Sequence, residues 1–185
     1  MDRVPDVFND GLHLPKMMVF DLDYTLWPLW VDTHLSGRLK GSQDGRSVTD
    51  GSGTSYAFYT DVPGILSALK EKGILVCAAS RTHTPDRARE MLRLLRVDEE
   101  TKAIDVFDYL EIYPGSKITH FRRLHKTSGI DYKDMVFFDD ESRNRNVEEL
   151  GVVMQLVRDG VSRQEVDAGV ATWRRQTKQR EPSRA

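Results

Sequence analysis

The chain has 185 residues, with 27 Lys and Arg against 29 Asp and Glu, which gives a formal net charge of −2. This length fits one domain, and the balanced charge excludes a global electrostatic attraction to nucleic acid or to an acidic membrane surface. A single cysteine, no continuous apolar segment near the start and no run of about 18 apolar residues predict a cytoplasmic protein without a membrane partner.

The first expected elements lie in the N-terminal third of the chain. Residues 1–15 are expected to form a flexible segment ahead of a domain that spans residues 16–176. The run at 17–20 is wholly apolar, which favours a strand covered on both faces. Residues 27–60 are expected to form a small lid, because the stretch 36–55 is rich in Gly and Ser and predicts a long flexible loop or a small hairpin.

Apolar runs then alternate with helical patterns. The expected helices lie at residues 61–72, 84–95, 116–126, 143–150 and 162–178, and the expected strands at 74–79, 109–113, 135–138 and 152–157. Residues 177–185 are expected to be a flexible tail. Alternating strands and helices imply right-handed crossovers, so the sequence predicts a three-layer α/β domain with a Rossmann-like, open and mostly parallel sheet.

Reactive residue types follow four of the expected strands. They are Asp21, Asp23 and Thr25 after the first, Ser80, Arg81 and Thr82 after the second, Lys117 after the third, and Asp139 and Asp140 after the fourth. In such sheets the ligand site lies beyond the carboxyl ends of the strands. Four carboxylates gathered at one edge would repel one another, and a bound Mg²⁺ is the simplest relief. We therefore interpret the first acidic pair as a nucleophile and a proton carrier that share a metal.

Four motifs carry a resemblance to a known family. They are FDLDYTLWPLW at 20–30, AASRT at 78–82, EIYPGSK at 111–117 and MVFFDDE at 135–141. In order and spacing they resemble the motifs of the haloacid-dehalogenase-like (HAD-like) phosphatases, and together they are similar to the magnesium-dependent, acid phosphatase type branch of that superfamily. The resemblance spans about residues 16–175. Tyr24 departs from the commonest pattern, which has glycine at this position.

The resemblance implies a role for each matched residue. Asp21 attacks phosphorus and becomes an aspartyl phosphate, and Asp23 acts as general acid and then as general base. Ser80 hydrogen-bonds the transferring phosphoryl group, and Lys117 neutralises charge on that group and on Asp21. The substrate-binding residues that the resemblance implies are Leu22, Asp23, Ser80, Arg81 and Lys117.

The resemblance also implies a magnesium site. Mg²⁺ would be held by the Asp21 carboxylate, the Asp23 backbone carbonyl and one carboxylate of the last motif. Asp140 is the expected direct ligand, and Asp139 is the alternative. Asn144, one helical turn further on, is expected to orient a water bound to the metal.

The expected function is hydrolysis of phosphomonoesters, either phosphotyrosine in proteins or small sugar phosphates, by a monomer. A receiver-type signalling module also uses an acidic pair, a hydroxyl and a lysine with Mg²⁺, but its phosphoacceptor aspartate follows the third strand, where this chain has Tyr113 and Pro114. A catalytically inactive binding protein on the HAD-like fold is the other alternative. Trp27 and Trp30 either line the entrance or pack the loop onto the core, and Arg81 contacts either the phosphate or a carboxylate.

Overall fold

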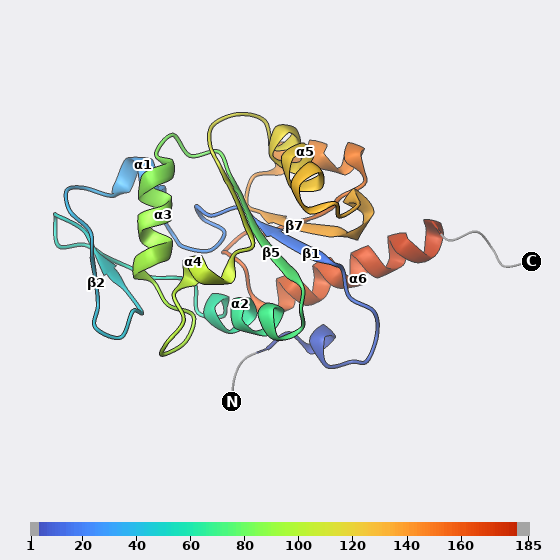
Figure 1. Cartoon of the computed structure of the whole chain (residues 1–185), viewed down its shortest axis with the longest axis horizontal. Coiled ribbons are helices and arrows are strands. Elements are labelled where there is room, and N and C mark those ends of the chain that lie inside the picture. Colours follow the sequence, from blue (N-terminus) through green and yellow to red (C-terminus); the bar gives the residue numbers. More distant parts are fainter. Residues whose placement is uncertain (1–3, 181–185) are drawn as a thin grey trace, which may run out of the picture.

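Met17–Phe20 forms the central strand β1, and all four of its side chains are fully buried. A computed structural model describes residues 4–180, except the side chains of residues 179 and 180. β1 belongs to a five-stranded sheet with the order β6-β5-β1-β7-β8 (Figure 1). The other strands are β5 (Leu75–Ser80), β6 (Tyr109–Ile112), β7 (Met135–Asp139) and β8 (Val153–Leu156). Every neighbouring pair is parallel, so the open parallel sheet predicted from the sequence is confirmed.

Helices cover both faces of the sheet and complete three layers. On one face lie α2 (Val62–Glu71), α3 (Pro85–Leu94), α4 (Ala103–Val106) and α6 (Arg163–Arg180); on the other lie α5 (Lys117–Ser128) and the 3₁₀ helix η3 (Ser142–Leu150). Alternate residues of β1 serve the two faces, as strand geometry requires. Met18 and Phe20 pack in the cluster with α2 and α6, whereas Met17 and Val19 pack with α5 and η3.

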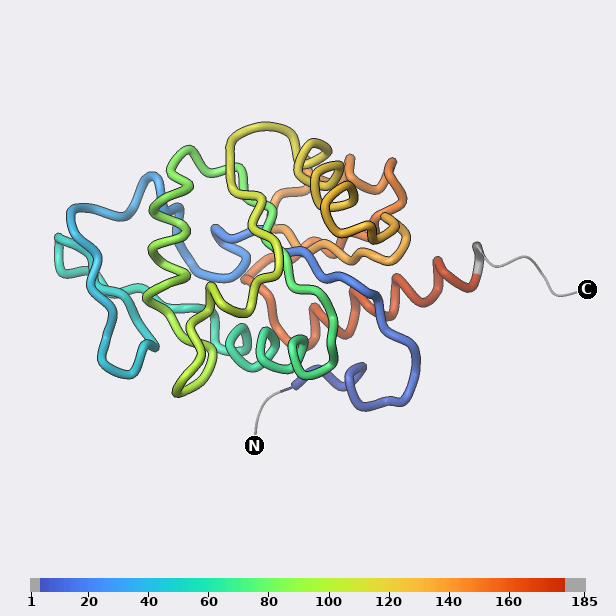
Figure 2. The backbone as a smooth tube through the Cα atoms, viewed as in Figure 1, coloured from blue at the N-terminus to red at the C-terminus, as the bar shows by residue number. Residues whose placement is uncertain are grey.

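The segment at residues 27–60, which was expected to form a small lid and is called the lid below, follows β1. It contains the short helix α1 (Val31–His34) and an antiparallel sheet of β2 (Lys40–Gly41), β3 (Val48–Thr49) and β4 (Ser55–Tyr56). In Figure 2 this segment lies beside α3, at the end of the molecule opposite the C-terminus. Asp50 holds it together, because its carboxylate accepts hydrogen bonds from the backbone N–H groups of Ser36, Ser52 and Thr54. Of the two expectations at 36–55, the small hairpin is present as β2 and β3, and β4 extends it to a three-stranded sheet.

The ends of the chain differ from the expectation of flexible segments. Residues 4–15 include the 3₁₀ helix η1 (Asp6–Phe8), whose Val7 and Phe8 are buried. The Val7 N–H donates to Asp167 of α6, and Arg174 forms an ion pair with Asp10. At the other end α6 continues through residues 177–180, and residues 181–185 lie outside the described chain. The apolar side chains of η1 explain why this segment packs on α6.

Two predicted details need correction. The helix expected at 143–150 is a 3₁₀ helix, η3, in which Asn144 and Val147 are the buried residues. This spacing of three matches the 3₁₀ period. The short elements α1, α4, η1 and η2 (Tyr132–Asp134) were not predicted, because three or four residues carry no readable periodicity.

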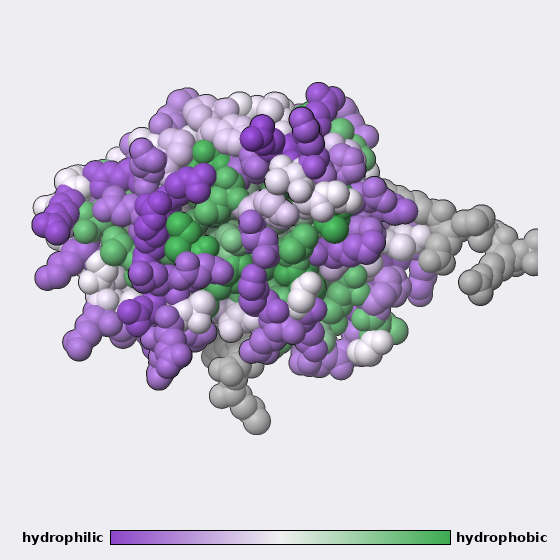
Figure 3. Space-filling model, viewed as in Figure 1, coloured by the Kyte–Doolittle hydropathy of each residue, from purple (hydrophilic) through white to green (hydrophobic). Residues whose placement is uncertain are grey.

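The surface seen in Figure 3 is mostly hydrophilic. Among residues 4–180, the large hydrophobic side chains that are exposed are Leu12 and Trp30. Within the same range, no helix combines the length and the apolar character needed to cross a membrane.

Candidate active site

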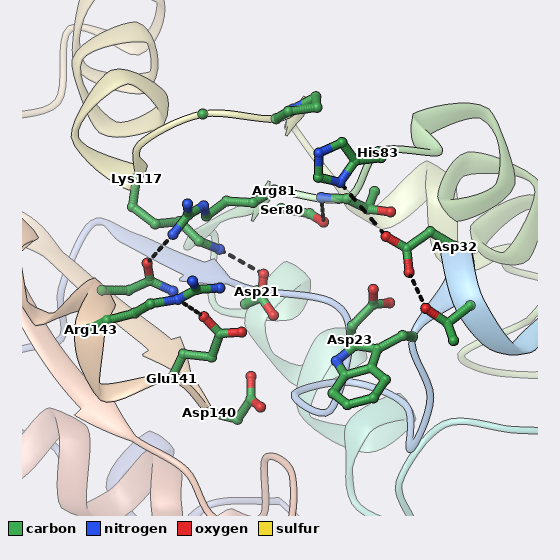
Figure 4. A pocket seen from close by; sticks show the side chains of 16 residues that line it. Asp21, Asp23, Asp32, Ser80, Arg81, His83, Lys117, Asp140, Glu141 and Arg143 are labelled. Carbon is green, nitrogen blue, oxygen red and sulfur yellow. Dashed lines mark hydrogen bonds and ion pairs between the residues drawn. The ribbon is translucent and has the colours of Figure 1, made fainter.

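A pocket of about 460 Å³ opens at the carboxyl edge of the sheet. Three strand ends and the start of α5 supply six of the expected residues that line it, namely Asp21, Asp23, Ser80, Arg81, Lys117 and Asp140, whereas the expected residues Leu22 and Asp139 do not line it. Figure 4 shows these side chains converging from separate elements. The parallel sheet brings them together, because β1 lies between β5 and β7 and all three strands end at the same edge.

Lys117 is a buried cation rather than a solvated surface lysine. It begins α5 directly after Ser116, whose hydroxyl caps the helix by accepting a hydrogen bond from the Ile118 N–H. The Lys117 side chain is 1% exposed, and its Nζ lies 2.6 Å from Asp21 Oδ1 and 3.2 Å from Asp139 Oδ2. Nζ also donates to the carbonyl of Ala79. One ammonium group thus joins the ends of β1, β5 and β7.

The two aspartates after β1 have different environments. Burial raises the pKa of Asp21 above its ordinary value, and the charge of Lys117 opposes the shift. Asp23 Oδ1 accepts a hydrogen bond of 2.7 Å from the Trp27 indole, and Oδ2 accepts one of 3.3 Å from the Val31 N–H. Burial raises the pKa of Asp23 to about 7, against these hydrogen bonds. Asp21 therefore has a cationic partner, whereas Asp23 can hold a proton at neutral pH.

Two tryptophans follow Asp23 and differ in position. Trp27 is fully buried, stacks on Phe58 at 5.9 Å and orients the Asp23 carboxylate, so it packs the loop onto the core. Trp30 is 48% exposed and lines the pocket.

Tyr24 lies between β1 and the two tryptophans and has φ 53°, the left-handed conformation that favours glycine. This backbone geometry explains why a glycine is frequent at the position that Tyr24 occupies here.

The adjacent acidic residues after β7 also differ. Asp139 is fully buried, and its oxygens accept hydrogen bonds from the Glu141 N–H at 2.7 Å and from Asn144 Nδ2 at 2.8 Å. Asp140 instead lines the pocket, and burial together with the charge of Asp139 raises its pKa to about 6. Asp139 is thus fixed by protein partners, while the Asp140 carboxylate faces the pocket.

The remaining expected residues have clear positions. Ser80 is buried at the end of β5, and its Oγ accepts a hydrogen bond of 3.3 Å from the Thr82 N–H. Arg81 lines the pocket and donates to Asn144 Oδ1 at 3.2 Å, so its protein partner is an amide. Leu22 is fully buried and does not line the pocket.

The rim of the pocket contains residues that were not among the expected site residues. They are Asp32, Thr33, His83, Pro114, Gly115, Glu141 and Arg143. Asp32 of α1 lies 3.9 Å from His83 and accepts a hydrogen bond from the Thr33 hydroxyl, so the lid meets the loop after β5 at the mouth (Figure 4). Glu141 pairs with Arg143 on the opposite side. Pro114, Gly115 and Glu141 lie inside the motifs EIYPGSK and MVFFDDE, whereas Asp32, Thr33, His83 and Arg143 had no sequence signal.

Three acidic residues could hold a metal ion in this pocket. Carboxylate oxygens of Asp21, Asp139 and Asp140 lie within 4.8 Å of one another. Hard divalent cations such as Mg²⁺ prefer oxygen ligands of this kind. Lys117 supplies a buried cation, Ser80 supplies a hydroxyl, and Asp23 can carry a proton. The pocket therefore contains the groups that phosphoryl transfer requires.

Comparisons with known proteins agree with this class. The acid phosphatase family model matches residues 13–176. A HAD-like hydrolase superfamily protein of Schizosaccharomyces pombe is 51% identical over 146 residues, which cover 77% of this chain and 85% of that protein. Magnesium-dependent phosphatase 1 of Homo sapiens is 44% identical over 164 residues, covering 86% of this chain and 88% of that one.

A solved structure shares the fold. A HAD-superfamily hydrolase from Ehrlichia chaffeensis aligns with a TM-score of 0.57 at 11% identity, over 88% of this chain and 99% of that one. The chain therefore belongs to the acid phosphatase family of the HAD-like superfamily, and it is a phosphatase.

Proposed function

We propose that the protein is a Mg²⁺-dependent phosphomonoesterase that works through an aspartyl phosphate on Asp21. The observation that carries this proposal is the contact of Lys117 Nζ with Asp21 at 2.6 Å, inside a pocket that Asp23, Ser80 and Asp140 also line. The receiver-type alternative has no support, because Tyr113 and Pro114 follow β6 where a receiver has its phosphoacceptor aspartate.

The donor set fits Mg²⁺. We assign the Asp21 carboxylate, the Asp23 backbone carbonyl and the Asp140 carboxylate as its ligands, since the oxygens of Asp139 are already engaged by Glu141 and Asn144. Burial of several carboxylates within 4.8 Å is otherwise electrostatically costly. When bound, Mg²⁺ offsets negative charge on these carboxylates and on the phosphoryl group. The magnesium dependence named for the human relative supports this assignment.

Asp21 supplies the nucleophile in the first step. One of its carboxylate oxygens attacks phosphorus, the bond from phosphorus to the ester oxygen breaks, and the leaving group departs with the proton of Asp23. Lys117 holds Asp21 in place and stabilises charge on the phosphoryl oxygens, while Ser80 and Arg81 line the same pocket as donors to them. Asp23 also contributes backbone groups.

Asp23 serves both steps. Its raised pKa suits a group that gives a proton to the leaving oxygen and then takes one from water. The water attacks the phosphorus of the aspartyl phosphate, which releases inorganic phosphate and restores the Asp21 carboxylate. The indole of Trp27 and the N–H of Val31 keep the Asp23 carboxylate aimed during both steps.

The substrate is a phosphomonoester, and we propose protein phosphotyrosine, small sugar phosphates or both. The lid is small and leaves the pocket open, which suits bulky substrates. Trp30 offers an aromatic surface at the mouth, and Asp32, Thr33 and His83 offer polar groups that suit hydroxyls. A panel of phosphopeptides and a panel of phosphorylated metabolites, assayed with Mg²⁺, would rank the two substrate classes by kcat/KM.

Asp21→Asn tests the proposed nucleophile in the same assays. An amide cannot form the acyl phosphate, so turnover should fall by about a thousandfold or more. The variant should retain its fold, because Lys117 keeps Asp139 and the Ala79 carbonyl as partners. Turnover within about tenfold of wild type, with deamidation excluded by mass spectrometry, would reject the covalent mechanism.

A further inference from the structure

His120 is a buried polar residue that the proposed mechanism does not use. It lies on α5, one turn after Lys117, and its side chain is fully buried. Its ring stacks on Tyr113 with the centroids 4.3 Å apart and the planes 8° from parallel. A histidine without solvent contact and without a catalytic role in the pocket requires a structural explanation.

Both ring nitrogens of His120 face backbone carbonyl oxygens. Nε2 lies 3.0 Å from Ser80 O and 2.8 Å from Tyr113 O, and Nδ1 lies 2.9 Å from Ser116 O. A carbonyl oxygen can only accept a hydrogen bond, so a ring nitrogen bonds to it only when that nitrogen carries a proton. We assign the Nε2–H as the shared donor to Ser80 and Tyr113, because two acceptors converge on that nitrogen.

The three carbonyls belong to segments that carry the phosphate-binding groups. Ser80 ends β5, Tyr113 follows β6, and Ser116 precedes Lys117 at the start of α5. The Tyr113 N–H also donates to Ser80 O at 3.0 Å, so the carbonyl that His120 contacts is already part of the junction between β5 and β6. Because His120 is itself part of α5, its Nε2–H links the ends of β5 and β6 to the helix that begins at Lys117.

We propose that His120 is a positioning residue that sets the separation of Ser80 and Lys117 by joining the ends of β5 and β6 to the start of α5. The proposal rests on the phosphate-binding roles proposed above for these two residues. Misplacing a catalytic group by about 1 Å can cost about a hundredfold in rate. His120 thus acts on the reaction through Ser80 and Lys117, without touching the substrate.

The protonation state agrees with a neutral ring. Burial lowers the pKa of His120 below its ordinary value. The backbone carbonyls of Ser116 and Tyr113 oppose this shift, whereas the charge of nearby Lys117 adds to it. A neutral imidazole has one N–H, so with the proton on Nε2 it donates to Ser80 and Tyr113, and Nδ1 makes no hydrogen bond to the Ser116 carbonyl 2.9 Å away.

His125 provides a matched control on the same helix. Its Nδ1 lies 2.7 Å from the Ile130 carbonyl, and its ring stacks on Tyr132 with the centroids 4.5 Å apart. The chemistry of its contacts resembles that of His120, but neither His125 nor its two partners lines the pocket. A purely structural role for His120 would make the two positions respond alike.

The experiment compares His120→Leu with His125→Leu in the full chain. Para-nitrophenyl phosphate hydrolysis, inhibition by inorganic phosphate, the apparent Mg²⁺ affinity and Tm are measured for both. For His120→Leu we expect kcat to fall by about tenfold to a hundredfold and phosphate inhibition to weaken by about tenfold, because the donors to phosphate have moved. Its Mg²⁺ affinity should stay within about twofold of wild type, because His120 contacts none of the proposed ligands. His125→Leu should lower Tm and leave kcat within about twofold.

A second pair of variants covers the case in which His120→Leu does not fold. His120→Gln places an amide N–H near the position of Nε2, and His120→Asn places one near Nδ1. We expect kcat of the Gln variant to exceed that of the Asn variant by about fivefold or more, since only Gln reaches Ser80 and Tyr113. Equal kcat in this pair, wild-type kcat in His120→Leu, or equal losses at positions 120 and 125 would overturn the proposal. An inactive wild-type protein would instead reject the proposed function.

Discussion

Asp21 and Asp23 are two residues apart, yet their partners prepare them for different tasks. Asp21 contacts the Lys117 ammonium at 2.6 Å, whereas Asp23 is held by the Trp27 indole and the Val31 N–H. A cation favours the ionised form of a carboxylate, and burial favours the protonated form. This difference is the physical basis for assigning the nucleophile to Asp21 and the proton carrier to Asp23.

Asp23→Asn should produce a defect that depends on the leaving group. The amide cannot transfer a proton, so an alkyl phosphate, whose alkoxide leaves poorly, should lose more of its rate of phosphoenzyme formation than para-nitrophenyl phosphate does. Single-turnover quenched-flow experiments with both substrates measure this rate. Because the backbone carbonyl at position 23 is unchanged, Mg²⁺ affinity should remain close to wild type. Equal slowing with both leaving groups, or a loss of Mg²⁺ affinity as large as that of Asp140→Asn, would contradict the assignment.

Lys117→Met should destabilise the protein as well as inactivate it. The variant leaves Asp139, which is 0% exposed, without its cation, and breaking a buried ion pair costs about 3–5 kcal/mol of unfolding free energy. Urea denaturation in EDTA measures this loss. Lys70→Met is the control, because Lys70 pairs with Asp108 at the surface and should cost about 1 kcal/mol or less. The double variant Lys117→Met and Asp139→Asn should recover part of the loss. Equal losses in the two single variants would show that the buried pair is not stabilising.

The sequence predicted which residue types meet in the pocket, because parallel strands end at one edge. It did not separate Asp139 from Asp140, since adjacent acidic residues look alike until Asn144 and the Glu141 N–H are placed around one of them. The rim residue His83 was missed for a related reason. Its contact with Asp32 joins two loops far apart in the chain, and no local pattern records it.

At the scale of elements, the lid is held by one carboxylate. Asp50 is 5% exposed and accepts hydrogen bonds from the Ser36 and Ser52 backbones and hydroxyls as well as from the Thr54 N–H. Arg87 of α3 anchors the same region by donating to the Gly37 carbonyl at 2.6 Å. A stretch rich in Gly and Ser can therefore be ordered, because a buried acceptor collects donors that are far apart in the sequence.

Asp50→Asn should loosen the lid in a pH-dependent way. Hydrogen bonds from Ser52 and Ser36 hold the pKa of Asp50 well below its ordinary value of 3.8. A carboxylate with a lowered folded-state pKa stabilises the fold fully above its ordinary pKa, and this contribution declines as the pH falls below that value. Amide hydrogen exchange in residues 36–55 should be faster in the variant at pH 6 than in wild type, and the difference should narrow toward pH 3. A constant difference across this range would contradict the role of the ionised carboxylate.

Long elements were predictable from the sequence, and short ones were not. The apolar run at 17–20 predicted β1, and the helical pattern that ends at Gly73 predicted α2. The 3₁₀ helix η3 was expected as an α-helix. One pair of buried residues three apart cannot distinguish the 3.0-residue period of a 3₁₀ helix from the 3.6-residue period of an α-helix. The packing of η1 on α6 was missed, because its contacts span most of the chain.

At the scale of the whole molecule, the sheet order places β1 between the strands that supply the other reactive groups. Asp21, directly after β1, consequently has Lys117 on one side and Asp140 on the other (Figure 4). The activity of the molecule should depend on a metal that fills the space between these carboxylates. The fold and the family together define a phosphatase.

Removal of Mg²⁺ should abolish turnover by the intact protein. With excess EDTA the clustered carboxylates lose their counter-charge, and added Mg²⁺ should restore activity. Ca²⁺ should bind but support little turnover, because it accepts more ligands at longer distances and disturbs the attack geometry of Asp21. Activity titrations with each ion after exhaustive chelation provide the measurement. Full activity in EDTA would contradict the metal requirement.

Chemical trapping tests most directly whether catalysis passes through a phosphoryl group on Asp21. Wild-type protein turning over para-nitrophenyl phosphate with Mg²⁺ is quenched in acid and reduced with borohydride, which converts an aspartyl phosphate into homoserine. Peptide mass spectrometry then locates the modified residue. The mechanism predicts homoserine at position 21, dependent on substrate and on Mg²⁺, and its accumulation in Asp23→Asn. Homoserine at another aspartate, or none at position 21 in both proteins while wild-type turnover is confirmed in the same sample, would contradict it.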